Sequence, residues 1–388
     1  MLDDYLKKES VLNVIGEIKN NPKYNGNSVS FRDSDFSSIE ISLYSFYDAL
    51  FKYKVIVDDD TLFGDFIEQV NKLYKKIDNF NDILLGINKL VGYMVIKHLK
   101  IKDINDPRQK KEVLDYIYDK YIVNGYYIHG ISSVYESDIK RDGFVSEIYL
   151  NNYDKMLEIK KIFEKYKFFD IVEKDFSLNK VYFTDDFMMG CYYSSVGPYY
   201  FYNMLFNRIY GNKINKDCYL KNDFDSSVNY LKKFMSNNLF SDKDKNLVLN
   251  NIKVHFDYLN SVPRKVSLII VKRNLINLQA TYSDYKDLDV DDIYEAIDMI
   301  LSSKNSNVGF SGTIQSNDIN IVSLDNCYDN SCKNDEDDDE ELVQKMDIKK
   351  ENKEFLDKYG SVYIFIIIGS LLVSFGVILS LFFMIRGI

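Results

Sequence analysis

The most constraining feature of this 388-residue chain is a run of 24 residues near its C-terminus, residues 362–385, without a single charged side chain. A helix rises about 1.5 Å per residue, so such a run spans the roughly 30 Å hydrocarbon core of a bilayer. A buried core helix is the alternative, but a long, uncharged run at the end of a chain is more typical of a membrane span. We therefore expect a single transmembrane helix over residues 361–386.

The charges that flank this run predict its orientation. Only Arg386 follows it, whereas five lysines precede it: Lys345, Lys349, Lys350, Lys353 and Lys358. The positive-inside rule keeps the lysine-rich side in the cytoplasm. The N-terminal sequence MLDDYLKKES lacks the basic region, apolar core and cleavage site of a signal peptide. We expect a tail-anchored, single-pass membrane protein whose N-terminal bulk is cytoplasmic and whose first partner is the lipid bilayer.

The composition of the chain narrows its functional class. A net charge of −10 offers no general basic face for phosphates, so general nucleic-acid binding is not expected. Four cysteines form no disulfide framework, and three histidines leave little material for a metal site, so no metal is expected. The 32 tyrosines belong to a general excess of residues with A/T-rich codons. Only the positions of individual tyrosines are therefore informative.

Residues 1–122 are expected to form a helical region without evident chemistry. Its clearest apolar stripe has helical spacing and consists of Phe63, Phe66, Ile67, Val70, Leu73, Tyr74 and Ile77. Asp60 or Thr61 is expected to cap the start of that helix. Further helices are expected over residues 82–99 and from Pro107, which suits a first helical turn.

From residue 123 the pattern changes, and residues 123–326 are expected to form a mixed α+β domain with a helical insertion. Strands are expected at NGYYIHGI, at NKVYFT, over residues 265–276 and as two short strands from Val308. A short helix is expected before Gly143, which would close it as a C-cap. Residues 327–360 hold a dense acidic run followed by alternating charge, which is typical of a linker.

Three short segments carry the candidate chemistry. His129 lies near the end of an expected strand, and Gly130 after it would let a ligand approach the backbone closely. Tyr182 lies in another strand, and Tyr193 lies eleven residues further on, in the next helix. Two facing aromatic rings make a slot for a flat, cationic heterocycle through stacking and cation–π attraction. The alternatives are a core histidine and core aromatic residues in a tyrosine-rich chain.

The order H-G, then I-x-x-x-G-F, then V-Y-F-T-D with a second tyrosine eleven residues later resembles the ADP-ribosyltransferase fold. It is most similar to the diphtheria-toxin and poly-ADP-ribose-polymerase branch, named for its His-Tyr-Glu triad. The resemblance implies a split sheet and NAD as substrate. It implies that His129 hydrogen-bonds the NAD ribose and that Tyr182 and Tyr193 sandwich the nicotinamide. Gly130 and Thr184 match the accompanying small and hydroxyl positions.

The glutamate of that triad has no counterpart on the closing strands. Residues 308–324 contain only Asp318 as an acid, and Gln315 is the polar candidate in place of the glutamate. Glu295 and Asp298 lie on the preceding helix. Without a carboxylate, positive charge developing on the ribose lacks its electrostatic partner.

Three functions therefore stay open. The first is transfer of ADP-ribose from NAD to a protein or nucleic-acid acceptor at the cytoplasmic membrane face. The second is a non-catalytic descendant that binds NAD, ADP-ribose or a partner protein. The third is a membrane-anchored interaction protein with an unrelated fold.

Overall fold

A computed structural model describes most of the first 324 residues: 2–24, 28–31, 34–145, 150–168, 181–196, 205, 209, 223–259, 261–262, 265–276, 292–302 and 308–324. The chain divides into two compact units, Met1–Ser331 and Cys332–Ile388. The expected linker, residues 327–360, and the expected membrane helix, residues 361–386, lie outside the described residues. Among the residues that are described, no helix is both long and apolar enough to cross a bilayer.

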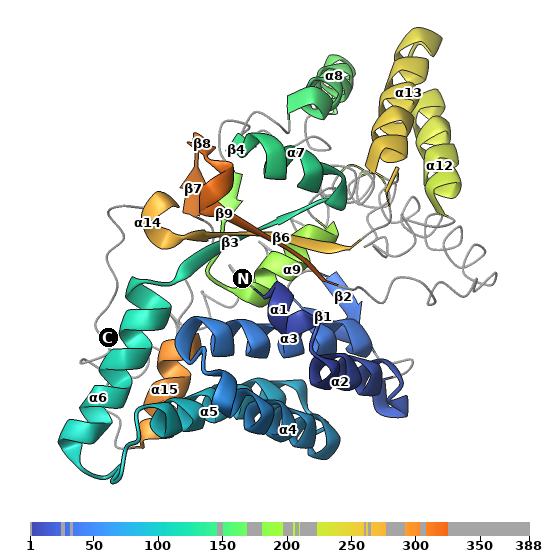
Figure 1. Cartoon of the computed structure of the whole chain (residues 1–388). Coiled ribbons are helices and arrows are strands. Elements are labelled where there is room, and N and C mark those ends of the chain that lie inside the picture. The colour runs from blue at the N-terminus through green and yellow to red at the C-terminus, as the bar shows by residue number, and fades with distance from the viewer. Residues whose placement is uncertain are drawn as a thin grey trace, which may run out of the picture. The chain divides into compact units, whose positions relative to one another are not determined.

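The first part of the chain is mainly helical, as expected (Figure 1). Its elements are α1 (Asp3–Leu6), α2 (Glu9–Lys19), the short helix η1 (Pro22–Tyr24), the strands β1 (Ser28–Phe31) and β2 (Ser34–Ser37), α3 (Ser38–Ile56), α4 (Asp60–Lys76), α5 (Phe80–His98), α6 (Pro107–Ile117) and the π-helical turn η2 (Tyr118–Val123). The antiparallel hairpin β1–β2 was not expected in this region. The expected cap of α4 is wrong by one residue, because the side chain of Asp59 accepts the N–H of Thr61.

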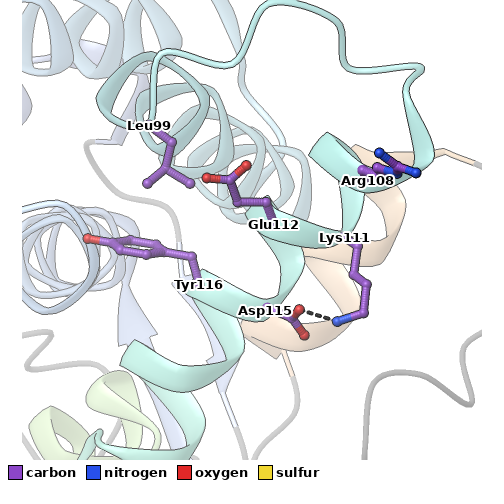
Figure 2. A pocket seen from close by; sticks show the side chains of 6 residues that line it. All are labelled: Leu99, Arg108, Lys111, Glu112, Asp115 and Tyr116. Atoms are coloured by element: carbon purple, nitrogen blue, oxygen red, sulfur yellow. Dashed lines mark hydrogen bonds and ion pairs between the residues drawn. The ribbon is translucent and has the colours of Figure 1, made fainter.

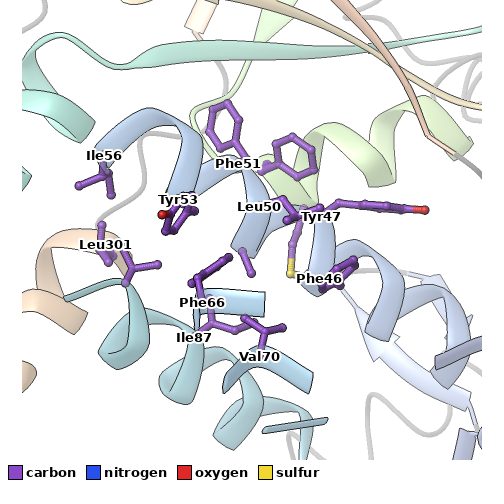
Figure 3. Packing of buried hydrophobic residues seen from close by; sticks show 14 of the residues in the cluster. Phe46, Tyr47, Leu50, Phe51, Tyr53, Ile56, Phe66, Val70, Ile87 and Leu301 are labelled. Carbon is purple, nitrogen blue, oxygen red and sulfur yellow. The ribbon is translucent and has the colours of Figure 1, made fainter. Parts of the chain in front are cut away.

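Helix α3 forms the centre of this helical region. Nearly all of its side chains are buried, including the charged Glu40, Asp48 and Lys52, so it is a helix enclosed on all sides rather than a surface helix. Ser37 and Glu40 close its start as a capping box, with each side chain accepting the other residue's backbone N–H. Figure 3 shows side chains of α3, such as Phe46 and Leu50, against Phe66 of α4 and Ile87 of α5.

The second part of the chain is mixed, which confirms the α+β class. Its described elements are β3 (Tyr126–Ile131), η3 (Ser133–Tyr135), α7 (Glu136–Asp142), β4 (Phe144–Val145), α8 (Leu150–Lys165), β5 (Val181–Phe183), α9 (Phe187–Val196), α12 (Asp223–Asn237), α13 (Asp242–Leu259), β6 (Val266–Lys272), α14 (Arg273–Ile276), α15 (Ile293–Ser302), β7 (Val308–Phe310), β8 (Thr313–Ile314), η7 (Ser316–Asp318) and β9 (Ile319–Leu324). The expected strand over residues 265–276 is wrong at its end, where the chain turns into α14. Gly143 closes α7 with a φ of 82°, as expected of a C-cap glycine.

The described strands of this second part form an antiparallel three-stranded sheet and two further pairs. The sheet has the order β3-β6-β9, and the pairs are β4 with β8 and β5 with β7. In the sheet, His129 lies opposite Ile269, which lies opposite Ile321. A single antiparallel bridge between Ile128 and Thr184 joins the end of β5 to β3. The two strands that carry His129 and Tyr182 are therefore neighbours.

Successive side chains along a strand point to opposite faces of the sheet. On one face, Ile128 and Leu268 pack in the large core with residues of α9; we call it the α9 face. On the other face, Tyr127, Ile131 and Ile269 pack in a second core with Phe144, Phe183 and Ile314; we call it the His129 face, because His129 shares the alternation of Tyr127 and Ile131.

One core joins the two parts of the chain. Helix α9 packs on β3 and β6 and also on α3, so it lies between the sheet and the helical region (Figure 1). Helix α15 packs on α5 and α6, although it lies far along the chain from them. A Cβ on Gly92 of α5 would stand 2.6 Å from a methyl group of Ile297, so this crossing is tight. Residues before and after 122 thus share buried contacts.

Candidate functional site

His129 lies in an aromatic environment on the sheet. The centroid of its ring is 5.3 Å from that of Phe183 and 5.8 Å from that of Phe144. Its Nδ1 is 2.9 Å from the backbone carbonyl oxygen of Tyr182. A carbonyl oxygen can only accept, so Nδ1 carries the proton and Nε2 holds the lone pair. Burial lowers the pKa of His129 to about 4, so the imidazole is neutral at neutral pH.

Tyr182 has a partly exposed ring, and its backbone carbonyl accepts the hydrogen bond from His129. The residue is 46% exposed, whereas its neighbour Phe183 is fully buried on the other side of the strand. The residue opposite Tyr182 on β7 is Gly309, which has no side chain to cover the ring. The structure therefore leaves this tyrosine available for stacking, unlike a core aromatic residue.

Gly130 and Thr184 both have structural contacts. A Cβ on Gly130 would stand 2.2 Å from the backbone nitrogen of Ser194 and 2.4 Å from the carbonyl oxygen of Gly190, so the glycine permits α9 to cross β3 closely. On this side, the backbone of the helix fills the space that the sequence assigned to a ligand. Thr184 is buried, and its Oγ1 accepts the N–H of Asp186, which itself caps α9.

Tyr193 belongs to α9, the helix that packs on the α9 face of the sheet. It is half-buried, and its ring meets that of Tyr192 edge to face, with centroids 5.3 Å apart. Thus β5 brings the backbone of Tyr182 to His129, but the ring of Tyr182 alternates with Phe183 and points away from the imidazole. Tyr193 is carried by the helix that packs on the opposite face of β3 from the imidazole.

Gln315 lies beside the His129 face. It is exposed and directly follows Ile314 of β8, which pairs with Phe144, a ring neighbour of His129. The acidic alternatives lie elsewhere or at the surface. Asp298 accepts a hydrogen bond of 2.7 Å from Asn88 within the helical region, and Asp318 is exposed in η7.

A buried ion pair near the site was not evident from the sequence. Arg273 and Asp185 are 3% and 4% exposed, and their charged atoms lie 3.1 Å apart. The guanidinium of Arg273 also lies 5.1 Å from the centre of the Tyr127 ring, and its backbone N–H donates to the carbonyl of Gly125. Asp185 lies between Thr184 and Asp186, so the pair ties the β5–α9 connection to the end of β6. The only sequence signal was an arginine at the end of an apolar strand.

A separate hollow lies on the helical region, away from these residues. Its volume is about 480 Å³, and it is lined by Leu99, Arg108, Lys111, Glu112, Asp115 and Tyr116 (Figure 2). Lys111 and Asp115 form an ion pair along one face of α6. The hollow is open to solvent and contains none of the residues that the sequence singled out. Across the described ranges, no three His, Cys, Asp or Glu side chains are grouped to hold a metal ion.

Comparison of the chain with protein-family models, curated proteins and solved structures finds no match. The resemblance to ADP-ribosyltransferases therefore rests on the motif residues alone.

Proposed function

We propose that this protein binds NAD and transfers its ADP-ribose to a protein or nucleic-acid acceptor. The proposal includes the split-sheet fold of the ADP-ribosyltransferases and a membrane anchor over residues 361–386 that leaves the N-terminal bulk in the cytoplasm. The observation that carries it is the contact between His129 and the backbone of Tyr182, because it joins two motifs 53 residues apart at one place.

Each residue of the proposed site has a chemical task. The imidazole of His129 is neutral and carries its proton on Nδ1. Its Nε2 accepts a hydrogen bond from a hydroxyl group of the ribose. The exposed ring of Tyr182 stacks on the nicotinamide, which is flat and cationic in NAD. Tyr193, the second wall that the sequence suggested, is carried by α9 on the opposite face of β3 from the imidazole and has no task in this arrangement. When the glycosidic bond breaks, its electron pair goes to the nicotinamide nitrogen, and a nucleophile of the acceptor attacks the cationic ribose carbon.

The second candidate function is binding of NAD or ADP-ribose without transfer. It is favoured by the closing strands, where Gln315 carries a neutral amide that does not offset the charge developing on the ribose. Both candidates require NAD to bind at His129 and Tyr182, so binding is the first property to measure.

The experiment uses the full chain in detergent micelles, with NAD binding measured by calorimetry and transfer measured with labelled NAD. Replacing Tyr182 by alanine should raise the Kd by roughly 5- to 150-fold, because a stacked base contributes about 1–3 kcal/mol. Tyr93→Ala is the matched control, since Tyr93 is also an exposed tyrosine, 39% accessible on α5. If NAD does not bind at millimolar concentration, or if both variants bind equally, the proposed site is wrong.

A further inference from the structure

The turn between α12 and α13 carries the most exposed large apolar residue that the structure describes. Leu239 is 86% exposed, whereas the next such residue, Leu12 on α2, is 51% exposed. Leu239 has a φ of 59°, in the left-handed region that favours glycine. The N–H groups of Leu239 and Phe240 donate to the carbonyls of Ser236 and Met235, which makes the turn a Schellman cap of α12. A leucine is less stable than glycine at this position, so its exposed side chain needs another explanation than stability.

Helix α8 ends in the same way beside this turn. Lys167 is exposed and has a φ of 66°, and the N–H of Phe168 donates to the carbonyl of Phe163 at 3.0 Å, as in a second Schellman cap. The ring of Phe168 stacks on that of Phe240, with centroids 5.8 Å apart. Helices α8 and α13 also pack together (Figure 1). The two caps therefore lie side by side and expose Lys167 near Leu239.

The carboxylate of Asp244 ties the α8 cap to the start of α13. It accepts hydrogen bonds from the ammonium group of Lys165, the phenol of Tyr166 and the hydroxyl of Ser241, each at 2.7 Å. These donors lower the pKa of Asp244 to about 2, so the carboxylate stays ionised at neutral pH. The ring of Tyr166 also stacks on that of Phe240, with centroids 3.9 Å apart. The contacts fix the two caps relative to each other.

The charge around the two caps is opposite in sign to that of the whole chain. The segments that meet here are residues 160–168 and 230–246, and we call them the tip. They hold eight lysines against three acidic residues, a net charge of +5, whereas the chain as a whole carries −10. Two of the three acids, Asp242 and Asp244, form ion pairs with lysines. An exposed apolar side chain among lysines is typical of a surface that binds an anionic bilayer.

We propose that the tip docks on a bilayer that contains anionic lipids, with Leu239 inserted among the headgroups and the exposed Lys167 and Lys243 next to their phosphates. The inference rests on the membrane anchor of the proposed function and is independent of NAD binding. One leucine and a few lysines bind a bilayer only weakly by themselves. The anchor keeps the tip close to the surface, so docking becomes an intramolecular step that weak contacts can complete.

The test makes use of the absence of tryptophan from the chain. Leu239→Trp places a single tryptophan at the tip, and the full chain is reconstituted in vesicles of phosphatidylcholine, with or without phosphatidylserine. Tryptophan favours the membrane interface, and brominated lipids quench it there. We expect blue-shifted emission and quenching in the vesicles with phosphatidylserine only. Leu12→Trp is the matched control, because Leu12 is an exposed leucine outside the tip, and its tryptophan should stay unquenched in both kinds of vesicle.

A second set of variants tests the lysines. In the Leu239→Trp chain, Lys167→Gln and Lys243→Gln should each lower the ratio of docked to undocked tip by about fivefold, because each lysine near an anionic surface contributes to binding. Lys100→Gln is the matched control. Lys100 is also exposed, has a φ of 57° and follows the end of α5, as Lys167 follows the end of α8. Its replacement should leave the ratio unchanged.

The outcomes separate the tip from the anchor. Suppose that the chain enters both kinds of vesicle and the tryptophan at the tip is not quenched when phosphatidylserine is present. The inference is then overturned, and the anchor stands. If the chain floats only with vesicles that contain phosphatidylserine, and its tryptophan is quenched there, the inference holds and the anchor is wrong. Flotation with neither kind overturns both. Equal quenching in the two kinds of vesicle, or an emission shift caused by an RNA or DNA duplex instead, also overturns the assignment to anionic lipid.

Discussion

The buried pair of Asp185 and Arg273 leads to the sharpest stability prediction. Arg273→Met keeps much of the apolar stem but removes the guanidinium, so the carboxylate of Asp185, 4% exposed, loses a cation at 3.1 Å. Breaking a buried pair by removing one partner typically costs about 3–5 kcal/mol. The lost contact with the ring of Tyr127 acts in the same direction. We expect the free energy of unfolding to fall by about 4 kcal/mol, a large part of the 5–15 kcal/mol typical of a domain.

The same reasoning predicts a rescue. Replacing both partners, as in Asp185→Leu with Arg273→Met, removes both buried charges and should recover at least about half of the loss, because buried pairs exchange well for apolar residues. Lys272→Met is the matched control, since Lys272 is the exposed neighbour of Arg273 and should change stability by less than about 0.5 kcal/mol.

The measurement is urea unfolding followed by far-UV circular dichroism, because the chain contains no tryptophan to report by fluorescence. The described part of the chain is rich in helix, so the signal is strong. Two results would refute the role given to this pair. One is a loss in the free energy of unfolding below about 1 kcal/mol for Arg273→Met. The other is a loss in the double variant that equals or exceeds the sum of the losses in the two single variants.

Three further predictions follow from the geometry and from the chain ends. Gly130→Ala should cost about 1–3 kcal/mol or more by thermal unfolding, because its Cβ meets the backbone of Ser194 rather than a flexible side chain; a neutral result would contradict the α9–β3 crossing. Burial, aided by the charge of Lys155, lowers the pKa of His255 to about 4, so the unfolded chain takes up that proton first and stability should fall as the pH drops from 6.5 to 4. If the urea midpoint of His255→Leu falls with pH as steeply as that of the unchanged protein, the assignment is wrong. A chain that ends at Gly360 should be found in the soluble fraction; retention in membranes would show that residues 362–385 are not the sole anchor.

Secondary structure was largely predictable because its signals are local. The apolar stripe of α4, the proline at the start of α6 and the glycine at the end of α7 each act within a few residues. The expectations were wrong at the ends of two elements, where a neighbouring residue or a different secondary structure was favoured instead. The cap of α4 shifted to Asp59, and the strand β6 gave way to a helix at Arg273, whose burial against Asp185 depends on distant residues. The membrane span over residues 361–386 and the linker before it remain predictions.

The candidate site was partly predictable for the same reason. The motifs named His129 and Tyr182 as residues to examine, and strand alternation follows from the pattern around each. The contact between them depends on β3 and β5 becoming neighbours, which is set by packing in two cores. The pattern around Gly130 indicated a close approach, but only the position of α9 shows that a helix makes it.

The amino-acid order thus determined where most helices and strands form, which segment is apolar enough for a membrane and which short motifs are candidates for chemistry. Each of these is a property of a window of a few to some twenty residues, in which hydrogen bonding and side-chain periodicity act along the chain. Tertiary structure decided which face His129 occupies, that Arg273 is buried against Asp185, and that Glu136 reaches two serines on strands far along the chain. These contacts join residues separated by dozens to nearly two hundred positions, so they arise only when the sheet and α9 pack together and exclude water from the space between them.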